Sequence, residues 1–119
     1  MRKITRLASE AFIANVDWHL DNTRVAVDEN RTVLYLHNNI IALKKHDAPD
    51  GVLLTLAGWG TPTTRERLNG LLAMLGHPTV GFSQRKGEQY LRTTSAGRRV
   101  ADDELISINL LTGDEYSKG

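Results

Sequence analysis

Short segments with alternating apolar and polar side chains fill residues 24–57, and tight polar turns separate them. An alternation with period two, as around Val25 and Leu34, is typical of a strand with one buried face. The breaks are rich in Asp, Asn, Pro and Gly, and Asn38-Asn39 suits a two-residue hairpin turn because Asn tolerates positive φ. The predicted strands are 24–27, 33–37, 40–44 and 52–57. Strands joined by so few residues predict an antiparallel meander, and this constrains the fold more than any other feature.

Two segments have the three- and four-residue apolar spacing of an amphipathic helix. The first covers residues 3–16, with an apolar stripe at Ile4, Leu7, Ala8, Ala11 and Phe12. The second begins at Thr63, which matches the capping box together with Glu66, and Gly76-His77-Pro78 ends it. Its leucines predict a buried face, and Arg65 and Arg67 are predicted to point away from that face.

The rest of the chain predicts two or three more strands. The hairpin FSQRKGEQYL spans residues 82–91, a polar loop covers 93–99, and residues 100–111 are apolar enough for one more strand or a short helix. Residues 112–119 are expected to fray. A length of 119 residues suffices for one domain and not for two ordinary ones. The prediction is a single α+β domain, residues 1–119: an antiparallel β-meander with an N-terminal helix and a central helix packed on the sheet, followed by a C-terminal hairpin.

Charge is distributed unevenly along the chain, although the net charge is only +1. Residues 63–100 carry seven basic and two acidic side chains, a local balance of +5, whereas residues 101–119 have a local balance of −4. If the basic side chains share one face, they form a surface for the phosphates of a nucleic acid. The candidate nucleic-acid-binding residues are Arg65, Arg67, Arg85, Lys86, Arg92, Arg98 and Arg99.

Two features of this basic region have both a functional and a structural interpretation. The helix start at Thr63, Thr64 and Arg65 offers hydroxyls and the positive end of the helix dipole to an anion, but the same residues also make a well-capped helix without a ligand. The Arg-Lys turn of the 82–91 hairpin lies beside Phe82 and Tyr90, and cations next to aromatic rings suit a single nucleic-acid strand. A solvated turn explains the same cations, and Phe82 equally suits the core.

Several classes of chemistry have no support in the sequence. The chain has no cysteine, its four histidines show no metal-ligand spacing, and it contains no nucleophile elbow, phosphate-binding loop or dinucleotide fingerprint. We therefore expect a protein that is not an enzyme and that uses no cofactor or metal. No apolar run approaches the roughly 20 residues that span a bilayer, and Ser9 and Glu10 interrupt the N-terminal segment, so we expect neither membrane association nor a secretory signal. The absence of cysteine fits a reducing cytoplasm.

Four motifs, taken together, resemble a pattern in small, uncharacterised proteins of tailed bacteriophages. They are Asn22-Thr23-Arg24-Val25, then Leu36-His37-Asn38-Asn39-Ile40-Ile41-Ala42, then Gly58-Trp59 with Thr61-Pro62-Thr63-Thr64 and Arg67-Leu68-Asn69, and finally the hairpin FSQRKGEQYL. They match an NT-x-V strand, an LHGN-like hairpin in which Asn38-Asn39 stands in place of Gly-Asn, a GW-x-T-x-TT-x-x-RLN helix start, and a final hairpin with an aromatic end. The resemblance covers about residues 22–91 and implies the cytoplasm of an infected bacterium, without an activity or catalytic residues. Within these motifs we expect Asn69 to bond a neighbouring loop and Trp59 to pack in the core rather than to anchor a partner.

The leading hypothesis is a non-enzymatic, phage-type accessory protein that binds nucleic acid through its basic face. The alternative is a protein-interaction module that binds a host protein or forms a homodimer through a sheet edge. The second hypothesis predicts a partner whose binding is insensitive to charge reversal at Arg85 and Lys86. A further hypothesis is that the acidic tail shields the basic face, so that removal of residues 112–119 tightens nucleic-acid binding.

Overall fold

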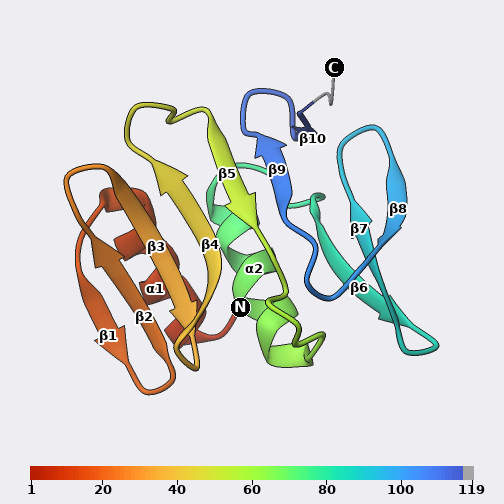
Figure 1. Ribbon diagram of the computed structural model, residues 1–119, viewed down its shortest axis with the longest axis horizontal. Helices are drawn as coiled ribbons and strands as arrows, with labels where there is room; N and C mark the ends of the chain where they lie inside the picture. Colours follow the sequence, from red (N-terminus) through yellow and green to blue (C-terminus); the bar gives the residue numbers. More distant parts are fainter. Residues whose placement is uncertain (117–119) are drawn as a thin grey trace.

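The computed structural model describes residues 1–116, which form two helices and ten strands in two antiparallel sheets (Figure 1). The larger sheet has the strand order β1 (Trp18–Leu20), β2 (Thr23–Val27), β3 (Arg31–Leu36), β4 (Asn39–Lys45), β5 (Gly51–Leu54), β9 (Ile106–Asn109) and β10 (Asp114–Glu115). The smaller sheet consists of β6 (Gly81–Arg85), β7 (Glu88–Arg92) and β8 (Gly97–Val100). The helices α1 (Lys3–Ala14) and α2 (Pro62–Met74) lie behind the larger sheet in the view of Figure 1, and β6 packs against α2. The predicted α+β architecture is confirmed.

The first five strands form the predicted meander, in which each strand is antiparallel to the one before it. The turn between β3 and β4 consists of His37 and Asn38, because Leu36 pairs with Asn39. Both turn residues have the positive φ that a two-residue hairpin turn needs, 48° and 65°. The predicted turn at Asn38-Asn39 is therefore wrong by one residue. The buried pattern explains the difference, since Leu36 is the last core-facing residue of β3 and needs a partner in the ladder.

The larger sheet is completed late in the sequence, where β9 pairs with β5. Residues 55–105 lie between these two strands and contain α2 and the whole smaller sheet. The predicted hairpin at residues 82–91 corresponds to β6 and β7, and β8 adds a third strand to it. Within the segment expected to fray, residues 114–115 pair with β9, and the Tyr116 hydroxyl donates to the carbonyl of Asp50 at 3.1 Å. The last residues of that segment, 117–119, lie outside the described part of the chain.

Helix α2 begins earlier than predicted. Thr61 is its N-cap, with a hydroxyl that accepts the N–H of Thr64 at 3.2 Å, and Pro62 occupies the first helical position. Proline is favoured there because its fixed φ suits the helix and its missing N–H would have had no partner within the helix. The predicted capping box of Thr63 and Glu66 is therefore wrong, and the Glu66 carboxylate turns toward α1 instead.

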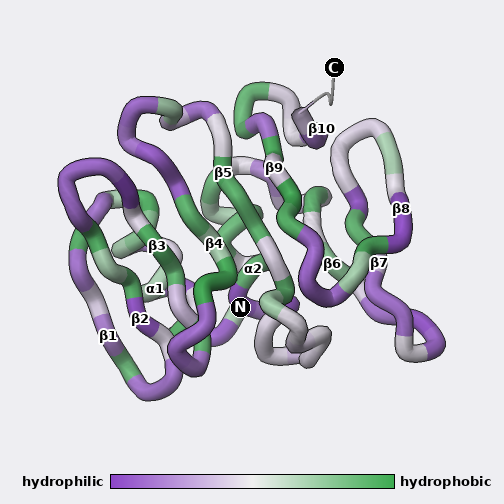
Figure 2. The backbone as a smooth tube through the Cα atoms, in the orientation of Figure 1, coloured by the Kyte–Doolittle hydropathy of each residue, from purple (hydrophilic) through white to green (hydrophobic). Residues whose placement is uncertain are grey.

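One hydrophobic cluster connects both helices with both sheets, and the most hydrophobic parts of the backbone trace run through β4, β5 and β9 (Figure 2). Helix α2 lies at the centre of this arrangement. Gly70 brings it close to α1, because a Cβ at this position would lie 2.3 Å from Cγ2 of Thr5. Asn69 holds β6, since its Nδ2 donates to the carbonyl of Phe82 at 2.9 Å and its Oδ1 accepts the N–H of Phe82 at 2.7 Å. The expected structural role of Asn69 is confirmed, with a strand rather than a loop as its partner.

Candidate nucleic-acid interface

The seven candidate cations separate into two groups. Four of them are exposed on the smaller sheet and its tight turn: Arg85, Lys86, Arg92 and Arg99. The other three are turned toward the protein and bonded there: Arg65, Arg67 and Arg98. The basic surface is therefore smaller than the charge distribution along the sequence indicates.

The guanidinium of Arg67 lies in the core, and only 2% of this residue is exposed. Its Nη1 donates to Thr5 Oγ1 at 2.9 Å and to Glu66 Oε1 at 2.5 Å, and its Nε donates to Thr23 Oγ1 at 3.1 Å. These bonds connect α2 with α1 and β2. The prediction that Arg67 points away from the buried face is wrong, because two hydroxyls and a carboxylate satisfy the charge inside the protein. A nucleic acid on the surface cannot reach it.

The proposed anion site at the start of α2 does not assemble. Thr64 is buried, and its hydroxyl lies 2.9 Å from the hydroxyl of the N-cap residue. The Nη1 of Arg65 turns back to donate to the Gly60 carbonyl at 2.8 Å and to Gln89 Oε1 at 3.0 Å. Thr63 and Thr64 both line a cleft that is described below, and Arg65 does not line it. Arg65 therefore connects the loop before α2 with β7 instead of joining the two threonines.

Arg98 is neutralised by two carboxylates. Its Nη2 lies 2.5 Å from Glu104 Oε2 and 2.7 Å from Glu115 Oε1, and its Nε donates to Glu115 Oε2 at 2.8 Å. Hydrogen bonds to Glu115 and Glu104 raise the pKa of Arg98 above its ordinary value. This cation therefore connects β8 with β10 and contributes little charge to the surface. The idea that the whole tail shields the basic face stays a prediction.

Three of the four exposed cations share one face of the smaller sheet, and Lys86 lies in the β6–β7 turn. Because side chains alternate along a strand, one face carries Ser83, Arg85, Glu88, Tyr90, Arg92 and Arg99. The opposite face carries Phe82, Leu91 and Val100, which are buried. The cross-strand register places Tyr90 between Ser83 of β6 and Arg99 of β8, so its ring lies at the centre of the exposed face.

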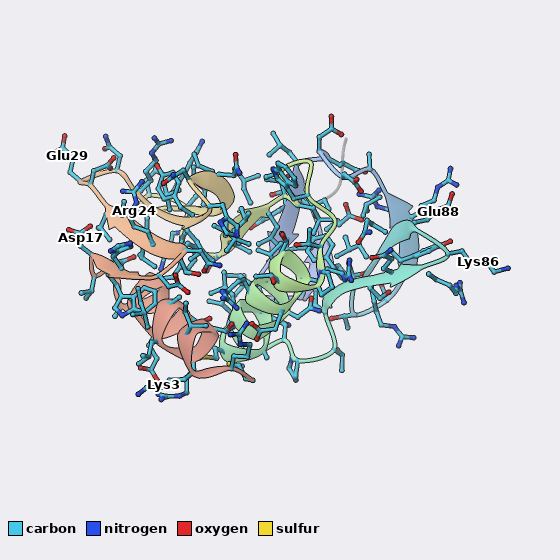
Figure 3. The ribbon with its side chains drawn as sticks, turned by 90° about the horizontal axis from the view of Figure 1, so that it is seen from below. Lys3, Asp17, Arg24, Glu29, Lys86 and Glu88 are labelled. Carbon is cyan, nitrogen blue, oxygen red and sulfur yellow. The ribbon has the colours of Figure 1, made fainter. Side chains whose placement is uncertain are left out.

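Ring and charge contacts organise this face. The guanidinium of Arg85 lies over the ring of Tyr90, 5.2 Å from its centroid. The Tyr90 hydroxyl lies 3.3 Å from Glu88 Oε2, and Arg99 Nη1 lies 2.9 Å from Glu88 Oε1. Lys86 and Glu88 project from the far end of the β6–β7 hairpin, well away from the core (Figure 3). Three cations, Arg85, Arg92 and Arg99, and one carboxylate thus share the face of one aromatic ring, and Lys86 lies beyond them in the turn.

Arg92 lies between two shallow depressions on this side of the protein. The first, of about 640 Å³, surrounds Tyr90. The second, of about 510 Å³, is lined mainly by hydroxyl-bearing residues: Thr79, Thr93, Thr94 and Ser95. Ser95 is bound to the Asp114 carboxylate at 2.8 Å, but Arg92 forms no ion pair within residues 1–116. Arg92 is therefore the cation best placed to bind a phosphate between the two depressions.

The described residues give little support to a metal site or to a membrane-spanning helix. Among residues 1–116, no three His, Asp or Glu side chains come together in a way that could hold a metal ion. Two histidines lie near backbone carbonyls instead: His77 Nε2 is 2.6 Å from the Leu110 carbonyl, and His46 Nδ1 is 3.2 Å from that of Glu29. Neither of the described helices has the length and apolar character needed to cross a bilayer.

Trp59 is the residue that sequence reasoning placed least well. It is 60% exposed, so the prediction that it packs in the core is wrong. The core below it is already filled by leucines of α2 and by Leu56. The loop itself carries a signal of this exposure, since glycines flank the tryptophan on both sides and the following helix supplies its own apolar stripe.

Residues 1–115 match the family model described as the Kyanoviridae Gp96 protein. The chain belongs to this family. The match confirms the resemblance to phage proteins and extends it beyond residues 22–91, to the N-terminal helix and to most of the acidic tail. No curated protein and no solved structure matches the chain. Membership in the Kyanoviridae Gp96 family thus identifies a phage protein and assigns it no function.

Proposed function

We propose that this phage protein binds single-stranded nucleic acid on the exposed face of its smaller sheet. The observation that carries the proposal is the position of Tyr90 at the centre of a face with three exposed cations, Arg85, Arg92 and Arg99, and with Lys86 in the adjoining turn. Cations bind the phosphates of any nucleic acid, but an exposed ring binds a base face only where bases are unpaired. The combination therefore favours a single strand over a duplex.

We propose a different role for each of these side chains. Arg92 and Lys86 have no ion-pair partner within the described residues, so each can bind a phosphate without first breaking a bond. Arg99 shares the Glu88 carboxylate and contributes less charge. Arg85 stacks on Tyr90, and a base that stacks on the ring either displaces this guanidinium or binds the ring's other side. Phosphate contacts thus supply the salt dependence, and Tyr90 supplies the preference for unpaired bases.

The test is the affinity for a labelled, unstructured DNA 12-mer, measured by fluorescence anisotropy over a range of salt concentrations. Arg92→Ala should weaken binding and reduce the slope of log affinity against log salt by about 1, because it removes one phosphate contact. Tyr90→Ala should weaken binding by about 1–3 kcal/mol and leave that slope unchanged.

The larger sheet offers a matched control. Arg24 lies over the ring of Tyr35, 4.1 Å from its centroid, and repeats the Arg85–Tyr90 arrangement on another sheet. Arg24→Ala and Tyr35→Ala should leave oligonucleotide binding unchanged. Absence of binding by the unaltered protein at low salt would refute the proposal, as would an equal loss from the control variants.

Protein interaction is a second candidate, and one observation favours it. Strand β1 lies at the edge of the larger sheet, is only three residues long, and has exposed apolar side chains at and near it: Val16 and Leu20. Edge strands with apolar neighbours can pair with another chain. We propose a homodimer through β1 as the alternative, tested by light scattering. A dimer that persists in Arg85→Glu and dissociates in Leu20→Glu supports it, and a monomer at high protein concentration contradicts it.

A further inference from the structure

A cleft of about 400 Å³ lies between the β3–β4 turn and the start of α2, which both lie toward the bottom of the view in Figure 1. Ten residues line it: Leu36, His37, Asn39, Ile41, Leu56, Ala57, Trp59, Thr61, Thr63 and Thr64. The proposed nucleic-acid face lies on a different sheet, so this cleft is a separate feature. Its size is within the range of small-ligand sites, which begin at about 300 Å³.

The floor and one wall of the cleft are apolar. Leu36, Ile41 and Leu56 form the floor and are almost fully buried. The wall is the indole of Trp59, which is 60% exposed. An indole usually buries its ring and keeps only its N–H near water. A flat aromatic wall left open above an aliphatic floor is suited to receive a second flat ring.

The rim of the cleft is polar, and His37 is its one titratable side chain. None of the ten lining residues is Lys, Arg, Asp or Glu. The Thr63 hydroxyl has no hydrogen-bond partner within the described residues, and the Asn39 amide makes one weak bond, to the His37 carbonyl at 3.3 Å. These groups can both donate and accept hydrogen bonds. A charged ligand would lose its hydration here without a counter-charge, whereas a neutral ring with donors and acceptors along its edge would be satisfied.

The backbone at this cleft is held in an uncommon conformation. His37 and Ala57 both have positive φ, 48° and 55°, although neither is glycine. The hairpin turn between β3 and β4 accounts for the value at His37, so of these two residues only Ala57 lacks such an explanation.

The cleft also has a direct connection to the smaller sheet. The loop that carries Trp59 is bonded to β7 through Arg65, which donates both to the Gly60 carbonyl and to Gln89. Gln89 Nε2 adds a weaker bond to the same carbonyl at 3.3 Å. Gln89 is the neighbour of Tyr90 in the sequence, so these bonds connect the loop of the exposed Trp59 with the strand of the half-buried Tyr90.

From these observations we infer that the Trp59 cleft binds a neutral nucleobase, stacked on the indole with its polar edge toward Thr63 and Asn39. This inference deepens the proposed single-strand binding and rests on it for the source of the base. The same chemistry can come from a free nucleoside or from an unpaired base within a strand, and the two sources are separated by experiment. An aliphatic side chain of a partner protein fits less well, because it would leave the Thr63 hydroxyl without a partner.

The experiment uses tryptophan fluorescence. The protein has two tryptophans, so Trp18→Phe leaves Trp59 as the only emitter. Titration of this variant with adenosine, and separately with an unlabelled dA 12-mer, should quench the emission saturably, because a stacked base quenches indole. Quenching by both ligands shows that the cleft accepts a base from either source, and quenching by the oligonucleotide alone assigns the site to strands.

Affinity measurements in the otherwise unaltered protein complete the test. Trp59→Ala should weaken binding of the labelled 12-mer by about 5- to 150-fold, the range expected for one lost stacking contact. Trp59→Phe should retain most of the affinity, and Leu111→Ala serves as the control because Leu111 is also an exposed apolar residue and lies outside the cleft.

The failure of this inference can be distinguished from failure of the proposed function. If neither adenosine nor the oligonucleotide quenches Trp59, and Trp59→Ala binds like Leu111→Ala, the inference is overturned while salt-dependent binding by the smaller sheet stands. If the 12-mer does not bind at low salt but adenosine still quenches Trp59, the proposed function is overturned and the cleft remains a nucleoside site.

Discussion

Replacement of the buried Arg67 is the sharpest test of the fold. Arg67→Met keeps a long apolar side chain of similar size, so the loss of packing is small, but it removes every hydrogen bond of the guanidinium. The two threonine partners are themselves fully buried. Each keeps one other bond: Thr5 donates to Glu66, and Thr23 donates to the side chain of Asn22. The substitution therefore removes charge-assisted bonds without leaving a hydroxyl entirely unpaired.

The expected loss follows from those bonds. A hydrogen bond to a charged group contributes about 1.5–3 kcal/mol, and Arg67 makes two of them to buried hydroxyls. The pair with Glu66 adds less, because that carboxylate is 29% exposed and can be rehydrated. Removal of one partner from a buried ion pair typically costs 3–5 kcal/mol, and the low end applies here. We expect the free energy of unfolding to fall by about 3 kcal/mol.

Equilibrium unfolding in urea measures this loss. With a typical denaturant dependence of about 1–3 kcal/mol per molar urea, the midpoint should fall by roughly 1.5 M. Arg92→Met is the matched control: the same substitution at an exposed site should change stability by no more than about 0.5 kcal/mol. A loss below about 1 kcal/mol for Arg67→Met, or a loss equal to that of the control, would refute the view that this network holds the helices on the sheet.

Three further outcomes are expected. Gly70→Ala should reduce stability by about 1 kcal/mol in thermal unfolding, because overpacking against Thr5 outweighs the gain in helix propensity; a more stable variant would contradict the close helix contact. Asn69→Ala should cost about 1–3 kcal/mol, because two backbone groups of β6 lose their partner, and faster amide exchange in β6 than in β2 would identify the cause. The backbone N–H and hydroxyl of Ser95 hold the pKa of Asp114 below its ordinary 3.8, so its contribution to stability is present above about pH 4 and is lost as the pH falls through the lowered value. Asp114→Asn should therefore be less stable than the unaltered protein at pH 7 and show a smaller difference at pH 2, and an equal difference at both values would argue against the assignment.

The fold could be predicted from the sequence wherever one local pattern had one interpretation. Alternating side chains with short polar breaks gave the meander, and a three- and four-residue apolar spacing gave both helices. The errors lie where two local signals compete. At the start of α2, Thr61 and Thr63 can both cap a helix, and only the position of Pro62 decides between them. The pairing of β9 with β5 could not be predicted, because it joins segments far apart in the sequence.

The sequence predicts that the region around the candidate site is basic. It predicts only in part which of its cations are exposed. Arg85, Arg92 and Arg99 are exposed on one face of the smaller sheet, and Lys86 is exposed in its turn, as a basic surface requires. A sequence shows how many charges a segment has, but not which of them the fold uses internally. Arg67 is the clearest example, since its partners come from two other elements of the chain. The exposed Trp59 was missed because tryptophan, without further information, is best assigned to the core.

The late pairing of β9 with β5 has a consequence for how the protein forms during synthesis. Strands β1–β5 can pair as they leave the ribosome, since each contacts its neighbour in the sequence. The open edge of β5, however, stays exposed until residues 106–109 have been translated, and closure then encloses residues 55–105 in one loop. Long-range strand pairing is slow compared with local pairing, so the nascent chain carries an unprotected apolar strand until residues 106–109 have been made and have paired.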